Sequence, residues 1–328
     1  MSDLLCPSQE EIENELRQRG LIPELIQGMT KADLPGLEGL PQIVTRTEFL
    51  ALQLRFGFQR AVAIVREKID LDELERELRQ SDPLRIIEST AQMILLGEMF
   101  LEPARQTLEG SYLRGARVGE RVLRMGPRVG IRFDAMNPHA ALFARTRSGA
   151  LITQIGESQR EAIRNLVESA VGGGRTVGDI ARDIRHIVGL RDDQLRALLK
   201  YRDVVSDPKR KLTVDEIEKK VRRYADALVK QRAELIAQTE VLTAANAGQL
   251  EIWHEAQRQG TLDGSHGKVW ITTPDEFLCP FCEELDGQVA NLNAQFESDY
   301  EQVQHPPLHP QCRCSIGLEK IERANESH

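Results

Sequence analysis

TVDEIEKKVRRYADALVKQRAELIAQTEVLTAANAGQLEIWHEAQRQ (residues 213–259) is one continuous helical pattern, and it decides the fold class of this chain. Thr213 and Glu216 have the spacing of a capping box, which marks the start of a helix. At a rise of about 1.5 Å per residue, this helix would be about 70 Å long. Such a length exceeds that of an ordinary globular helix, so we expect a spine or an assembly contact.

Two rows of side chains repeat every seven residues along this helix. The first row is apolar: Val214, Val221, Leu228, Leu235 and Leu242. The second is mixed: Ala225, Arg232, Thr239, Asn246 and Trp253. One interpretation is self-association as a coiled coil, and the other is packing against the chain's own helices.

The rest of the chain up to about residue 260 also has helical spacing. Further helices are predicted at 46–69, from Asp82-Pro83 onward, at 137–171, at 176–188 and at 192–201, with a loop at 31–42. Gly172-Gly173-Gly174 reads as a linker, because no Lys-Ser/Thr follows it at the spacing of a phosphate loop.

Composition supports a mainly α fold. The 328 residues are 41% apolar, 5% aromatic and 29% charged, which suits helices packed by aliphatic side chains. We expect an elongated helical body with a long spine helix and a small C-terminal α+β module. The predicted divisions are 1–135, a helical region; 136–260, helical with the long helix; and 261–328, the Cys/His module with a polar tail.

Charge and hydropathy exclude several classes of protein. The net charge of −8 argues against a dedicated nucleic-acid coat protein, since phosphate neutralisation needs a basic excess. No apolar run reaches the length of about 18 residues that spans a bilayer, so no membrane partner is expected. The start of the chain lacks a signal peptide, which predicts synthesis in a cytoplasm.

A basic row interrupts this acidic chain. Residues 114–132 contain Arg114, Arg117, Arg121, Arg124, Arg128 and Arg132 against one acid, Glu120. A spacing of three to four places most of them on one helical face. One interpretation is contact with DNA or an acidic partner, and the other is a solvated basic face.

The amino-acid pattern changes from helical spacing to short strand-like segments after residue 260. Short strands are predicted at 268–273, 287–289 and 314–318, from β-branched and aromatic content. Four of the five cysteines lie in this segment, at 279–314. In a reducing compartment such clustering indicates a metal site before disulfides.

The metal-ligating candidates are Cys279, Cys282, His309, Cys312 and Cys314. A Cys-x2-Cys turn presents two thiolates to one point, and a closed zinc site needs four donors. We predict Cys279, Cys282, His309 and Cys312 as ligands, with Cys314 as the substitute and His305 as a further nearby donor. Unligated buried thiols and disulfides remain the alternatives. A small module gains folding free energy from a metal that its own core cannot supply.

A catalytic zinc is not expected. No His-x-Glu lies upstream at a suitable place, and His-Glu-x-x-His is absent. A hydrolase or nuclease would need an open metal position and a carboxylate such as Glu283 or Glu284.

The module is strongly acidic. Between Lys268 and Arg313 there is no lysine or arginine, and the acids are Asp275, Glu276, Glu283, Glu284, Asp286, Glu297, Asp299 and Glu301. Such a surface is a poor DNA reader and suits a basic protein surface or plain solubility.

Residues 228–318 resemble the phage Mu F-like minor head proteins, also called phage head morphogenesis proteins. The resemblance lies in Trp270-x-Thr272, Asp275, Cys279-Pro280-x-Cys282, Leu285-x-Gly287, the Phe296 region, His305-Pro306-Pro307-Leu308-His309-Pro310 and Cys312-Arg313-Cys314. The lead-in Arg232–Glu240 and Ala245-Asn246-Ala247-Gly248 is also similar, with Gln238 where the family usually has arginine. Residues 142–200 are similar in texture, and 1–140 have no match.

The resemblance implies a non-enzymatic, low-copy component of a phage head. It implies the portal protein and the inner capsid surface as partners, a virion location, and a role in head assembly, packaging or DNA delivery. Some members carry a C-terminal toxin domain, and only 14 residues follow Cys314, so none is expected here. A DNA-binding regulator acting through the arginine row is a further alternative.

Overall fold

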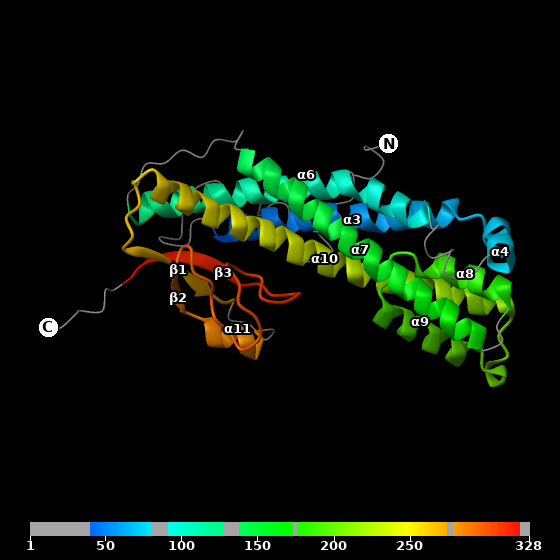
Figure 1. The fold of residues 1–328 in the computed structure, drawn as a ribbon. Coiled ribbons are helices and arrows are strands. Elements are labelled where there is room, and N and C mark those ends of the chain that lie inside the picture. Colours follow the sequence, from blue (N-terminus) through cyan, green and yellow to red (C-terminus); the bar gives the residue numbers. More distant parts are fainter. Residues whose placement is uncertain (1–39, 81–90, 128–137, 173–175, 274–277, 322–328) are drawn as a thin grey trace. The chain divides into compact units, whose positions relative to one another are not determined.

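The computed structural model describes residues 40–80, 91–127, 138–172, 176–273 and 278–321 (Figure 1). It confirms a mainly helical protein with one small sheet near the C-terminus. The α-helices are α3 (Leu40–Lys68), α4 (Leu71–Gln80), α6 (Ala91–Met125), α7 (Pro138–Gly172), α8 (Val177–Ile187), α9 (Asp192–Val205), α10 (Val214–Arg258) and α11 (Pro280–Leu285). The strands are β1 (His266–Ile271), β2 (Val289–Asn291) and β3 (Ser315–Lys320), and a short 3-10 helix covers Pro208–Arg210. No helix among the described residues combines the length and apolarity that crossing a membrane requires.

The long helix is confirmed to within one residue at each end. Its predicted capping box is formed, because Glu216 Oε2 accepts from Thr213 N at 2.8 Å and Thr213 Oγ1 accepts from Glu216 N at 3.3 Å. The first heptad row is only partly buried, with Val214 exposed and Leu235 half-buried. The second row is the better buried one, and Trp253 is fully enclosed. This burial supports packing of α10 against the chain's own helices.

Other boundaries differ from the prediction. The loop predicted at 31–42 is wrong over 40–42, since α3 already begins at Leu40 and proline is tolerated in a first turn. Helix α9 continues to Val205 rather than ending near 201. The helix start predicted at Asp82-Pro83 lies outside the described residues, as do Gly173 and Gly174 of the predicted linker, whereas Gly172 is the last residue of α7. Helices α4 and α11 were not predicted.

The chain forms two compact units, each assembled from separate stretches of sequence. Unit 1 comprises 54–104 and 148–234 of the described chain, and unit 2 comprises 40–53, 105–147 and 235–321. The long helices α3, α6, α7 and α10 contribute residues to both units. The division into 1–135, 136–260 and 261–328 stays a prediction.

Unit 1 is a helical core built from aliphatic faces. Phe58 of α3 and Phe100 of α6 meet edge to face, with ring centroids 5.3 Å apart. The other helices add buried side chains that include Leu151, Ile155, Ile163, Ile184, Leu195, Leu198, Val221 and Leu228. Burial at helical spacings on every element explains why these sequences fold as helices.

A buried polar node holds the turn between α8 and α9. Gly189 has φ +84°, and a Cβ there would lie 2.5 Å from Val62 Cγ2, so glycine is required on both counts. Its N–H donates to Gln159 Oε1 at 2.6 Å, and its carbonyl accepts from Arg232 Nη1 at 3.0 Å. Arg232 also donates to Ser158 Oγ at 2.7 Å. The arginine of the family-like lead-in therefore fixes a turn in unit 1.

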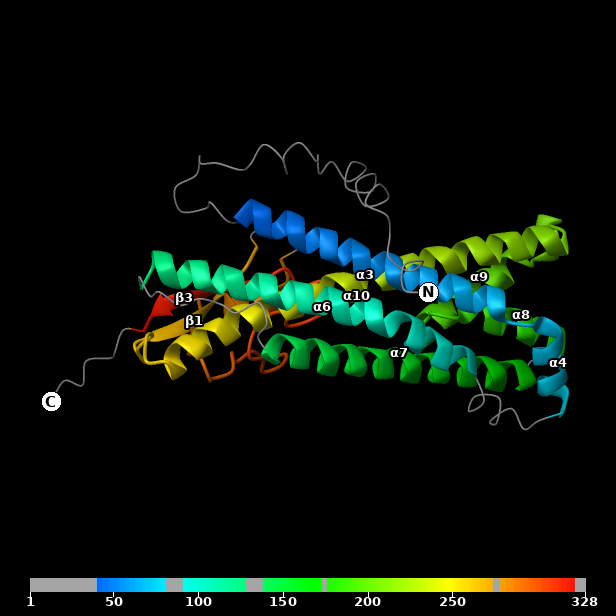
Figure 2. The same ribbon diagram turned by 90° about the horizontal axis from the view of Figure 1, so that it is seen from above.

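In unit 2, α6 and α10 cross at very short range, and both helices can be followed in Figure 2. A Cβ on Gly115 would lie 1.8 Å from the carbonyl oxygen of Ala245, and one on Gly248 would lie 1.9 Å from that of Tyr112. Only glycine lets the two backbones approach so closely. The Ala-Asn-Ala-Gly segment of residues 245–248 is thus a helix-packing motif.

The C-terminal sheet has the order β2-β1-β3 with both pairs antiparallel (Figure 1). Lys268 of β1 pairs with Ala290 on one side and Leu318 on the other. The predicted strands are confirmed in type, but β1 and β2 are displaced by two residues and β3 ends later. The module's core also includes Ala116 and Leu123 of α6 and Leu250, Ile252, Trp253 and Ala256 of α10. Gln249 Nε2 of α10 donates to the Ile316 carbonyl at 2.9 Å, which ties helix and sheet together.

Candidate metal centre

The first half of the site is the turn that begins α11. Cys279 is the N-cap of this helix, Pro280 occupies its first turn, and the Cys279 sulfur accepts from Cys282 N at 3.3 Å. A sulfur in this capping position and another three residues later lie on the same side of the turn. The local sequence Cys-Pro-Phe-Cys therefore presents two sulfurs to one point.

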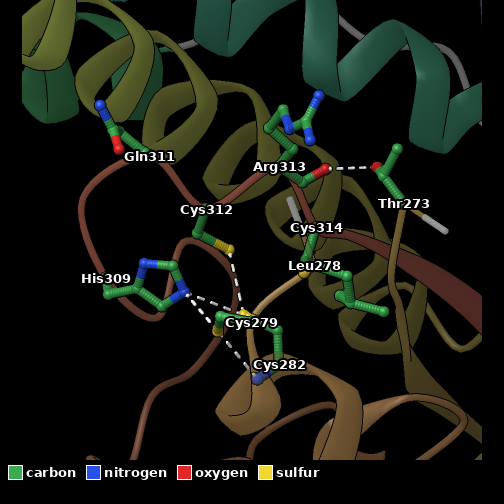
Figure 3. Close-up of a pocket in the computed structure, with 9 residues that line it drawn as sticks. All are labelled: Thr273, Leu278, Cys279, Cys282, His309, Gln311, Cys312, Arg313 and Cys314. Carbon is green, nitrogen blue, oxygen red and sulfur yellow. Dashed lines mark hydrogen bonds between the residues drawn. The ribbon is translucent and has the colours of Figure 1, made fainter. Parts of the chain in front are cut away.

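His309 completes the first group of donors (Figure 3). Its Nε2 lies 2.9 Å from Cys279 Sγ and 3.2 Å from Cys282 Sγ. Its Nδ1 lies 2.8 Å from the carbonyl oxygen of Pro310, which can only accept, so Nδ1 carries the ring proton. The lone pair of Nε2 therefore faces both sulfurs, in the orientation that metal-binding imidazoles have.

Cys312 and Cys314 form the second group, together with Cys282. The Cys282 and Cys312 sulfurs are 3.7 Å apart, and the four described cysteines are free thiols. Each group of three donors lies within 4.8 Å, and Cys282 belongs to both. A four-donor site centred on Cys282 would thus take Cys279 and His309 from one group and Cys312 or Cys314 from the other.

The two C-terminal thiols differ in their electrostatics. A hydrogen bond from Cys314, helped by backbone donors, lowers the pKa of Cys312 to about 5 despite burial. Its hydrogen bond to Cys312, together with burial, raises the pKa of Cys314 well above its ordinary range. Burial and the neighbouring Cys312 charge also raise the pKa of Cys282. Of the two thiols, Cys312 is therefore the more easily ionised.

Three donor separations can be compared with those around a tetrahedral zinc ion. With Zn–S near 2.3 Å and Zn–N near 2.0 Å, tetrahedral angles give about 3.8 Å between sulfurs and about 3.5 Å between sulfur and nitrogen. The separation of 3.7 Å between the Cys282 and Cys312 sulfurs meets the first value, whereas the His309 Nε2 distances of 2.9 Å to Cys279 and 3.2 Å to Cys282 are shorter than the second, so these donors would have to move apart to bind an ion. The cavity between the donors has a volume of about 20 Å³, room for one water-sized particle.

Several predicted residues lie apart from this cluster. His305 belongs to neither donor group of the described chain, and its Nδ1 lies 2.7 Å from the Pro306 carbonyl. Burial lowers the pKa of His305. The acids Asp275 and Glu276 lie outside the described residues. Asp286 accepts from Thr272 N at 2.9 Å and from its hydroxyl at 2.7 Å, so it ties the end of β1 to α11.

Lys268 is a buried residue that the sequence interpretation missed. It is fully enclosed in β1, donates to the Leu292 carbonyl at 3.1 Å and to Gln304 Oε1 at 2.9 Å, and lies 5.2 Å from the Phe296 ring centre. Burial lowers the pKa of Lys268 to about 8. The alternation of side chains along a strand could have predicted this burial, because Lys268 and the buried Trp270 are two residues apart and so lie on the same face of β1.

Trp270 connects the sheet to the cysteines. Its indole is fully buried, packs edge to face on Phe296, and interacts with the Cys314 side chain, where it acts to lower the pKa of that thiol. Within the described part of the chain, the indole nitrogen has no hydrogen bond of ordinary geometry.

The arginine row lies on the second half of α6. Arg117, Arg121 and Arg124 are exposed and Arg114 is half-buried. Arg124 forms an ion pair with Glu120 one turn earlier. Arg128 and Arg132 lie outside the described residues. The helical arrangement is as predicted, and a DNA or partner contact stays a prediction.

Comparison with known proteins agrees with the sequence resemblance. Residues 209–317 match the model of a family described as Phage Mu protein F like protein. No curated protein and no solved structure matches the chain significantly. The matched segment, about a third of the chain, holds α10, strands β1 and β2, the first half of β3 and all five Cys/His donors. Residues 209–317 of this chain are therefore similar to the Phage Mu protein F-like family, and this similarity supports a phage head morphogenesis protein.

Proposed function

We propose that the protein is a structural component of a phage head whose C-terminal module is held in shape by one zinc ion. The observation that supports the zinc is that two groups of donors, Cys279 with His309 and Cys312 with Cys314, both lie next to Cys282. Their chemistry, thiols and one imidazole, suits zinc better than a hard cation.

The zinc is proposed to be structural rather than catalytic. Four protein donors leave no open position for water or substrate. Neither Glu283 nor Glu284 is among the described residues that line the cavity, so neither carboxylate stands ready as a general base. The donors instead join α11 to the segment that leads into β3.

The test of the zinc is its stoichiometry in the purified full-length chain. One zinc per chain is expected, and Cys279→Ser should lower it while preserving most of the helical circular dichroism. Cys6→Ser is the matched control, because Cys6 lies outside the motif. Metal-free protein with an equally stable C-terminal region would refute this proposal.

In the virion we propose that the protein docks near the portal and the inner capsid surface, in support of head assembly, packaging or DNA delivery. The family match supports this assignment. Fractionation of purified proheads tests it, since the protein should remain with the portal when shell and portal are separated. Its complete release with soluble host proteins would contradict a head location.

A further inference from the structure

Two exposed aromatic rings lie beside the candidate metal centre. Phe281 has 42% of its surface exposed and Tyr300 has 54%. Their ring centroids are 5.4 Å apart with a tilt of 42°, and Tyr300 meets the His309 ring edge to face at 6.5 Å. Phe281, Tyr300 and His309 thus form one continuous surface of rings, here called the aromatic face.

The fold holds these rings outward. Phe281 stands between Cys279 and Cys282, whose sulfurs occupy the inner side of the turn, so its own side chain is left outside. Tyr300 lies in a tight turn in which Ser298 Oγ accepts from the backbone N–H groups of Tyr300 and Glu301 at 3.2 and 3.1 Å. Exposed aromatic rings fixed by backbone structure lose little conformational entropy when a partner binds.

The charges next to these rings are all of one sign. Glu284 follows Phe281 by three residues on α11 and so shares its side of the helix. Asp299 and Glu301 flank Tyr300 in sequence, and both are exposed. Across residues 278–312 of the described chain, no ion pair engages Glu284, Asp299 or Glu301. Residues 269–312 contain no lysine or arginine that could neutralise them.

We infer that the aromatic face is a docking surface for an arginine-bearing segment of another protein. A guanidinium stacks on an aromatic ring and at the same time directs its N–H fork to a neighbouring carboxylate. Carboxylates alone would serve any cation, but the paired rings favour the planar guanidinium over the ammonium of lysine. The inference adds a partner chemistry to the proposed head function and rests on that function only for the source of the segment.

The test is peptide binding to the full-length chain, with zinc content measured in every sample. The probes are three blocked peptides in which glycine alternates with arginine, lysine or citrulline, followed by calorimetry at two salt concentrations. The arginine peptide should bind, the lysine peptide should bind several-fold more weakly, and the citrulline peptide should not bind. Equal binding of arginine and lysine peptides would reduce the surface to a plain acidic patch and overturn the inference.

Variants separate the rings from the charges. Phe281→Leu and Tyr300→Leu should each weaken arginine-peptide binding by about two- to fivefold. Leu142→Ala, which trims an exposed apolar side chain of α7, is the control and should leave binding unchanged. Glu284→Gln should weaken binding at low salt, whereas Glu319→Gln on β3 should not. If Tyr300→Leu lowered only zinc affinity, the ring would merely support His309 and the inference would fail.

One further outcome concerns which molecule occupies the aromatic face. If the free chain self-associated, and if Arg121→Glu abolished this self-association, the occupant would be a second copy of the chain rather than a separate partner.

Because the probes are peptides, binding can fail while the protein still resides in phage heads. Conversely, peptide binding by a chain that never enters heads would sink the proposed function and leave the surface intact.

Discussion

Replacing Gly248 with alanine tests the close crossing of α6 and α10. The new Cβ would lie 1.9 Å from the Tyr112 carbonyl oxygen, and real Cβ atoms essentially never approach closer than 3.0 Å. The backbones must therefore separate by about 1.1 Å or more, in an interior too densely packed to absorb the change. Overpacking of this kind costs about 3 kcal/mol at its upper range.

Alanine also favours a helix over glycine, by about 1 kcal/mol. The net expectation for Gly248→Ala is therefore a loss of about 2 kcal/mol in the free energy of unfolding, or about 4–8 °C in Tm for a unit of this size. Urea and thermal unfolding followed by circular dichroism measure both quantities.

Gly110→Ala is the matched control, since Gly110 lies within α6, the helix that α10 crosses, in the same unit. Its Cβ would find Leu50 Cδ2 at 3.8 Å, an ordinary contact. This variant should be more stable than the parent by about 1 kcal/mol. Opposite signs for the two substitutions support the close crossing, whereas a Gly248→Ala protein as stable as the parent would refute it.

Three other measurements address the polar interior. Burial holds the pKa of Lys268 at about 8 against an ordinary 10.5, so the folded chain favours the neutral amine and the unfolded chain binds the extra proton between these values. The free energy of unfolding, measured with urea, should thus rise by up to about 3 kcal/mol as the pH increases from 8 to 10.5. In the Lys268→Met variant this rise should be absent. Cys312→Ser should weaken zinc binding in chelator competition far more than Cys314→Ser, and equal effects would contradict the ligand assignment. Arg232→Lys should cost about 2 kcal/mol in urea unfolding because one ammonium replaces a fork that serves both Gly189 and Ser158, and an unchanged midpoint would argue against that role.

The elements that sequence predicted best are those whose determinants are local. The capping box at Thr213 and an unbroken helical pattern fixed α10 to within a residue. The Cys-x2-Cys turn likewise depends on four neighbouring residues, and the structure brings both of its sulfurs to His309. Joining His309 to them, 27 residues further on, required the family-like motif as well as spacing.

Features that depend on tertiary contacts could not be predicted from the sequence. The aromatic face needs Phe281 and Tyr300 to meet across 19 residues of sequence, and no local rule predicts that meeting. The burial of Lys268 depends on a carbonyl and an amide supplied by residues 292 and 304. Helix α3 began earlier than predicted because Pro41 reads as a breaker in sequence, although its position in the first turn makes it harmless.

The enclosure of Trp253 in the core of the sheet module has a consequence for inheritance. This side chain comes from α10, and Ala116 and Leu123, which join the same core, come from α6 more than 140 residues before the sheet. A recombination event that exchanged only the segment after residue 260 would pair a foreign sheet with unadapted helix surfaces. Exchange between related phages should therefore succeed chiefly when the residues of α6 near 116–123 travel with the C-terminal segment. Co-variation between positions so distant in sequence should be visible among relatives.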